Sequence, residues 1–89
     1  MMARYYFNLH NSIGFVRDEE GRELSDIETA RAEAIRGARS VIAEDVLQGR
    51  LDLNGKIDVL DGDGALCLTI RFSDAVAVAP NPGPTGPHQ

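Results

Sequence analysis

The residues best suited to chemistry lie near the N-terminus, where His10 ends a stretch of alternating side chains. An imidazole beside carboxylates forms an acid-base pair or a metal site, because its charge changes near neutral pH and its nitrogens are good ligands. Here the neighbours Asn8 and Asn11 are amides, which neither titrate nor bind divalent cations strongly. The residues around His10 therefore favour a solvated or partner-facing surface over a catalytic or metal site.

Cys67 is the single cysteine and the other candidate nucleophile. A thiol acts as a nucleophile when its pKa is lowered or a base is adjacent, and neither a helix N-terminus nor a base lies near Cys67 in the sequence. One cysteine also excludes an internal disulfide and a zinc site built from several cysteines. We expect a structural or interface cysteine, no enzyme activity and no cofactor.

Residues 52–57 partly resemble a calcium-binding loop, with Gly55 at the position of the sharp turn. The first ligand position falls on Arg50, a cation, and the last on Asp61 in place of the bidentate glutamate. The second flanking helix is also missing from the sequence pattern. We expect these residues to form a turn without a metal ion.

Acidic side chains gather just before the strongest helix pattern. They are typical of a solvated turn that leads into a helix, and they also offer a contact for a basic protein partner. The chain has 9 Lys+Arg against 14 Asp+Glu and a net charge of -5, which argues against binding to a nucleic-acid backbone. The predicted acidic contact consists of Asp18, Glu19, Glu20 and Glu23.

The strands that must position these groups follow from hydrophobic spacing. Residues 4–10 alternate and predict a half-buried strand, and the apolar run at residues 13–16 predicts its hairpin partner. Residues 56–60 and 65–72 flank Asp-Gly-Asp-Gly, which predicts a second hairpin. Within the last strand, the side chains expected to share one face are Leu66, Leu68, Ile70 and Phe72.

The helix between the two hairpins has the clearest signals. Ser25 and Glu28 predict a capping box at its start, and Gly49 predicts its end. Gly37 lies inside the helix and indicates either close packing or a tolerated defect. The apolar stripe at helical spacing consists of Ile27, Ala30, Ala34, Ala38 and Val41, widened by Ile35, Ile42 and Val46.

The predicted order β-β-α-β-β indicates an α+β fold, a small antiparallel sheet packed on one helix. With 89 residues the chain has room for one domain, which we assign to residues 1–73. All four prolines fall in the last ten residues, so residues 74–89 are predicted to be a flexible Pro/Gly-rich tail. Residues 75–79 are apolar enough to form an edge strand, and this alternative stays open.

One helix covers one face of a sheet and leaves the polar face open. That face has a single aromatic side chain and no RNA-binding motif, which argues against an RNA-binding sheet. A folded part of about 72 residues hides only ~60% of its unfolded surface, so self-association would help to stabilise it. The predicted interaction face consists of Arg4, Tyr6, Asn8, His10, Thr69 and Arg71.

Three blocks resemble a known family: Arg4-Tyr5-Tyr6-Phe7-Asn8-Leu9-His10-Asn11, the acidic residues 18–24, and the helical residues 30–34. The family consists of short soil-bacterial proteins classed only as a domain of unknown function, and the likeness covers residues 4–72. Its members commonly carry aspartate where this chain has Asn8 and Asn11. The resemblance implies no activity, cofactor or partner.

These observations predict a non-catalytic protein-interaction or binding module, cytoplasmic and either homodimeric or bound to another protein. No stretch has the ~20 apolar residues of a membrane-spanning helix, and no signal peptide is evident. The alternative is an antitoxin-like regulatory protein, because a strand pair before an acidic-capped, alanine-rich helix resembles the N-terminal domain of HicB-type antitoxins. The Pro-x-x-Pro-Gly-like element and the C-terminal DNA-binding element of those antitoxins are missing here.

Overall fold

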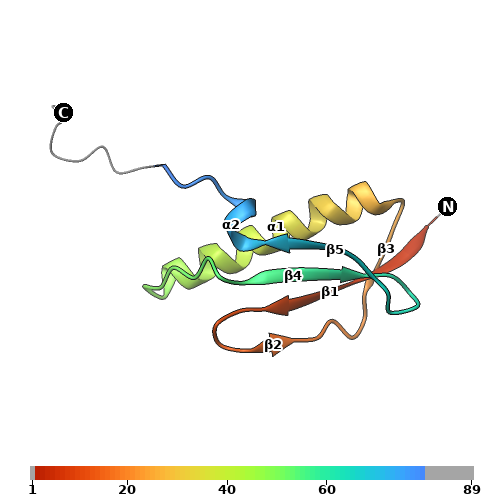
Figure 1. The fold of residues 1–89 in the computed structure, drawn as a ribbon, viewed down its shortest axis with the longest axis horizontal. Helices are drawn as coiled ribbons and strands as arrows, with labels where there is room; N and C mark the ends of the chain where they lie inside the picture. The colour runs from red at the N-terminus through yellow and green to blue at the C-terminus, as the bar shows by residue number, and fades with distance from the viewer. Residues whose placement is uncertain (1, 80–89) are drawn as a thin grey trace, which may run out of the picture.

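The computed structural model describes residues 2–79, which form a small antiparallel sheet packed against one long helix (Figure 1). This arrangement confirms the predicted α+β class, and it adds a third short strand and a four-residue helix to the predicted order. The elements in chain order are β1 (Ala3–His10), β2 (Phe15–Val16), β3 (Arg22–Leu24), α1 (Ile27–Leu47), β4 (Lys56–Leu60), β5 (Leu66–Arg71) and α2 (Phe72–Ala75).

The sheet has the strand order β2-β1-β4-β5, and β3 pairs with β1 beyond the end of β2. Within it, β1 pairs with β4 so that Asn8 lies opposite Asp58, and β4 pairs with β5 so that Asp58 lies opposite Thr69. Directly opposite residues of an antiparallel pair point to the same face. The register therefore lines up one residue from each of three strands in every row across the sheet.

The core lies between α1 and one face of the sheet. Phe72 and Val59 are its largest fully buried side chains. The helix contributes small side chains at intervals of four residues, so its backbone lies close to the sheet. Buried positions of α1 are Ala30, Ala34, Ala38, Ile42 and Asp45, whereas Val46, which we expected in the apolar stripe, is exposed.

The helix begins one residue later than the capping box predicts. Asp26 has an extended backbone, and its carboxylate accepts a hydrogen bond of 2.8 Å from the Thr29 N–H. The Ser25 hydroxyl instead lies 3.2 Å from the Thr29 hydroxyl, so Ser25 is not the N-cap. The predicted stop is confirmed, because Gly49 follows the helix with a φ of +85° that favours glycine.

The predicted β4–β5 hairpin is confirmed, but it contains an irregularity near its turn. Val59 lies opposite Leu68 and Leu60 opposite Leu66, so Cys67 is an extra residue in β5. One extra residue turns the preceding side chain to the other face of the sheet. Leu66 is therefore 61% exposed, and its predicted place beside Leu68 in the core is wrong.

The far end of β5 is fixed by Gly55 and Phe72. The Phe72 N–H donates a 2.9 Å hydrogen bond to the Gly55 carbonyl, and a Cβ on Gly55 would lie only 2.5 Å from the Phe72 ring. Glycine is thus required at position 55 by close packing rather than by calcium binding. The segment that we compared with a calcium site is an irregular connection with a bend at Asn54, and its last two residues belong to β4.

The packed part of the chain continues past the predicted boundary at residue 73. Ala75 is buried, and Arg39 donates a 2.7 Å hydrogen bond from Nε to the Ala75 carbonyl. Residues 76–79 form no strand in the structure, which decides the open question about residues 75–79. The remainder of the predicted tail, residues 80–89, lies outside the described residues.

Candidate functional site

The sheet face turned away from α1 is the candidate site, and it is called the open face below. In rows across β1, β4 and β5, it carries His10, Lys56 and Arg71, then Asn8, Asp58 and Thr69, then Tyr6, Leu60 and Leu66. Arg4 continues the face toward the start of β1. All six residues of the predicted interaction face therefore share one surface, and the structure adds to them the alternate residues of β4.

Asp58 organises the middle of the open face. Its carboxylate accepts a 2.7 Å hydrogen bond from the Thr69 hydroxyl and lies 3.2 Å from His10 Nε2. The Lys56 ammonium is 3.8 Å away. Because its two oxygens contact Thr69 and His10, the Asp58 carboxylate ties β1, β4 and β5 together.

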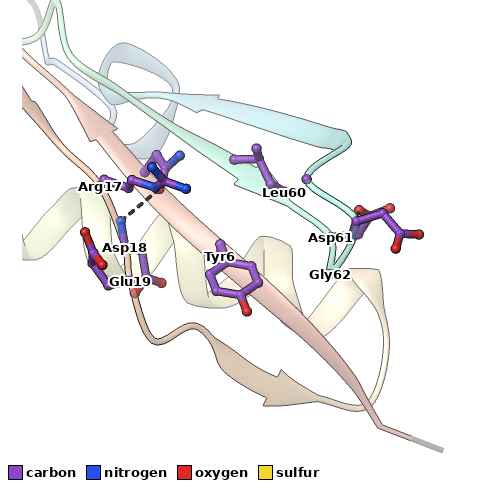
Figure 2. Close-up of a pocket in the computed structure, with 10 residues that line it drawn as sticks. Tyr6, Arg17, Asp18, Glu19, Leu60, Asp61 and Gly62 are labelled. Atoms are coloured by element: carbon purple, nitrogen blue, oxygen red, sulfur yellow. Dashed lines mark hydrogen bonds between the residues drawn. The ribbon is translucent and has the colours of Figure 1, made fainter.

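A hollow of about 390 Å³ opens in the same face beside Tyr6, and we call it the Tyr6 hollow. Figure 2 shows the Tyr6 ring between the Arg17–Glu19 segment on one side and the turn after Leu60 on the other, with the helix behind the sheet. Its charged lining is mostly acidic: Arg17, Asp18, Glu19, Asp61 and Asp63.

Asp18, which we predicted as part of an acidic contact, is also a structural residue. Its carboxylate accepts hydrogen bonds from the backbone N–H groups of Phe7, Glu20 and Gly21, at 3.0 to 3.2 Å. Burial raises the pKa of Asp18, but these N–H groups outweigh it and leave the pKa below the usual 3.8. The Asp18 N–H in turn donates to Asn8 Oδ1, so this side chain of the open face holds the loop.

The other three predicted acidic residues take part in fewer contacts within the described residues than Asp18 does. Glu19 and Glu20 are exposed, whereas Glu23 lies 3.2 Å from Arg4, whose guanidinium also donates to the Glu20 carbonyl. Arg4 is thus occupied in fixing the start of β3. Of the four predicted acidic residues, Glu19 and Glu20 are the two whose side chains have no hydrogen bond or ion pair within the described residues.

Cys67 and His10 do not form a catalytic pair. Burial, with a smaller contribution from the Asp61 carboxylate, raises the pKa of the Cys67 thiol, which opposes thiolate formation. Cys67 follows Leu66, which lies opposite Leu60, whereas His10 lies opposite Lys56, four residues from Leu60 along β4. Four residues along a strand correspond to about 13 Å, which is too far for proton transfer.

No metal centre is apparent within residues 2–79, where no group of three or more His, Cys, Asp and Glu side chains could hold an ion. Asp52, the start of the calcium-like segment, accepts hydrogen bonds from the N–H groups of Asn54 and Ser12. Those bonds lower the pKa of Asp52 and join the β1–β2 loop to the segment before β4. In the described part of the chain, no helix is long and apolar enough to cross a membrane.

A second hollow, of about 570 Å³, lies on the helix side of the sheet and was not predicted. Phe7, Ala34, Gly37 and Ile57 are among its apolar lining residues, and the Arg22 guanidinium lies 5.9 Å from the centre of the Phe7 ring. No sequence signal indicated it, because it depends on how residues 16–22 lie beside the middle of the helix. The residues of β4 on the open face, in contrast, could have been found by continuing the alternation through residues 56–60.

A family model described as a domain of unknown function, DUF6894, matches residues 4–73. The chain belongs to the DUF6894 family. This confirms the resemblance to a family of unknown function, over nearly the same residues. No curated protein and no solved structure matches the chain.

Proposed function

We propose that this DUF6894 domain is a non-catalytic protein-interaction module that self-associates through its sheet. The observation that carries the proposal is the coverage of the sheet: α1 and α2 pack on one face, and no described element covers the open face or the outer side of β5. Surfaces of this kind are where small domains gain the burial that their own core lacks.

The charges on the open face support a two-fold arrangement. Lys56 and Arg71 lie at one end of the strands, and the acidic turn with Asp61 and Asp63 lies at the other, where Arg4 is already paired with Glu23. In a two-fold dimer, a contact between residue i of one copy and residue j of the other occurs twice. An antiparallel arrangement therefore brings the basic end of each copy to the acidic end of its partner.

The chemistry of the site supports a non-catalytic role. The raised pKa of the Cys67 thiol and its distance from His10 on β1 leave Cys67 poorly suited to nucleophilic catalysis. A binding surface requires none of that reactivity.

The alternative function is an antitoxin-like regulatory protein that neutralises a basic partner. The observation that favours it is the acidic lining of the Tyr6 hollow, together with the exposed carboxylates of Glu19 and Glu20. Acidic surface of this kind attracts a basic protein over long range and speeds association.

The native mass of the full chain distinguishes these functions. Light scattering after size exclusion, from about 5 to about 200 µM protein, is expected to reach twice the 9.7 kDa chain mass as concentration rises. A single mass over the whole range contradicts self-association. Capture of a small basic protein at equal stoichiometry by a tagged copy, with the mass of the free chain unchanged, supports the antitoxin-like function instead.

A further inference from the structure

The outer side of β5 is an unpaired sheet edge, since β5 is the last strand in the order and pairs only with β4. An unpaired strand presents backbone N–H and C=O groups that form a template for another strand. The self-association proposed above therefore has a specific place where backbone hydrogen bonds are available.

The register shows which backbone groups are available. The Phe72 N–H donates to the carbonyl of Gly55, the residue directly opposite, so this is a hydrogen-bonded pair. Hydrogen-bonded and non-hydrogen-bonded pairs alternate along an antiparallel ladder. The next hydrogen-bonded pairs are thus at Ile70 and Leu68, and the backbone groups of Thr69 and Arg71 point away from β4.

The usable length of the edge is short and has a defined centre. Near the turn, the extra residue Cys67 interrupts the ladder, and at the other end α2 begins at Phe72. Thr69 lies midway between Cys67 and Arg71. Its side chain is exposed, with the hydroxyl bound to Asp58 on the open face, so the edge itself stays clear.

We propose that two copies pair antiparallel through β5, with Thr69 opposite the partner's Thr69, to make one continuous sheet across the dimer. This inference rests on the proposed self-association and specifies its interface. The register follows from the outward direction of the Thr69 backbone groups, because only residues with that direction can form a hydrogen-bonded pair with a second strand.

The side chains fit this register on both faces. On the helix side, Leu68 lies opposite the partner's Ile70, and apolar cross-strand pairs stabilise a sheet. On the open face, Arg71 lies opposite the partner's Cys67 and next to the partner's acidic turn. The Asp61 carboxylate is near enough to Cys67 to raise the pKa of its thiol, so Arg71 meets negative charge at both symmetric ends.

Disulfide trapping tests the register. In a hydrogen-bonded antiparallel pair the two Cα atoms are about 5.5 Å apart, within the range that a disulfide spans. The full chain with Thr69→Cys and Cys67→Ser is therefore expected to cross-link about tenfold faster than Asp63→Cys with Cys67→Ser, whose exposed turn cysteines lie at opposite ends of the dimer. The native Cys67 pair, about 14 Å out of register, is expected not to cross-link.

Two further variants test whether the dimer forms through the β5 edge or through another part of the sheet. Thr69→Pro removes an outward N–H, whereas Thr69→Val keeps that N–H and loses only the bond to Asp58, so proline is expected to weaken the dimer about tenfold relative to valine. Tyr6→Glu places a charge on β1, two strands from the edge, and is expected to leave the dimer intact.

The outcomes distinguish this inference from the proposed function. A doubled native mass without faster trapping at Thr69→Cys, or a dimer that dissociates in folded Tyr6→Glu, overturns the β5 interface but leaves self-association standing. A single native mass at every concentration overturns both. A doubled mass with rapid trapping at Thr69→Cys supports both, even if Thr69→Pro fails to fold.

Discussion

The two edges of the sheet differ in how their outer backbone groups are covered. On the β1 side, the outer backbone groups are covered by two very short strands, β2 and β3, and by one side chain between them. On the opposite side, the six residues of β5 have no such cover among the described residues. Natural sheets commonly protect their edges, and this difference is the reason why we propose the β5 edge for pairing with a second copy.

The protected edge depends on Asp18 because β2 and β3 do not form one continuous strand. Leu9 lies four positions after Tyr5 in β1, whereas their partners Val16 and Arg22 lie six positions apart, so two extra residues must leave the ladder. The Phe7 N–H lies in this gap, and the Asp18 carboxylate accepts its hydrogen bond in place of a strand carbonyl.

The largest effect is expected from Phe72→Ala, which removes the side chain that anchors the exposed edge strand. Phe72 is fully buried and packs on Gly55, so its loss is expected to destabilise the domain by about 3–5 kcal/mol. Urea denaturation measures the change. Phe15→Ala in β2 is the matched control, because Phe15 is 54% exposed, and it is expected to cost less than about 1 kcal/mol. Equal losses of stability in the two variants would show that the buried Phe72 contributes no more to folding than the exposed Phe15.

A smaller effect is expected at the protected edge from Asp18→Asn. The amide keeps the shape but cannot accept all three N–H groups, and it leaves the part-buried Phe7 N–H without a good acceptor. We expect a loss of about 1–3 kcal/mol in the free energy of unfolding. The exposed neighbour Glu19 serves as control, since Glu19→Gln is expected to change it by less than about 0.5 kcal/mol.

The Asp18 carboxylate at the same edge makes the stability of the domain depend on pH. The folded-state pKa of Asp18 lies below its usual 3.8, so the unfolded chain binds this proton first as pH falls. The stabilisation is complete above the usual pKa and is lost as pH falls through the folded pKa. The stability gap between the native chain and Asp18→Asn is therefore expected to shrink between pH about 6 and about 2.5 in urea titrations. A gap that stays constant or widens toward low pH contradicts this role of the carboxylate.

The smallest effect is expected from Gly37→Ala on α1, over the middle of the sheet and away from both edges. A Cβ on Gly37 would lie 3.5 Å from Ile57 Cδ1, which is an ordinary contact. Of the two interpretations left open by the sequence, the structure therefore supports a tolerated defect. Thermal unfolding should show a gain of about 0.5–1 kcal/mol, because alanine has the better helix propensity and fewer unfolded conformations. A loss of stability would mean that the helix needs closer packing there.

Local patterns were sufficient to predict the long helix, the two hairpins and the face that most residues occupy, but not β3 and α2. The alternation at residues 4–10, the Asp-Gly turn before β5 and Gly49 after α1 each depend on neighbours in the chain, and each is confirmed. One error, at the start of the helix, occurred where two local signals competed. Ser25 and Asp26 are both good N-caps, and in the structure it is Asp26 that accepts the hydrogen bond from the Thr29 N–H.

The sequence by itself determined the α+β class, the helix, the two hairpins and a polar face opposite the helix, because hydrophobic period and turn chemistry are local properties. Only the tertiary structure decided that Asp18 fills a gap in the sheet, that an extra residue turns Leu66 outward, and that the unpaired edge is β5. Each of these depends on which residue lies opposite which across the sheet, and strand register is fixed by contacts between segments far apart in the chain.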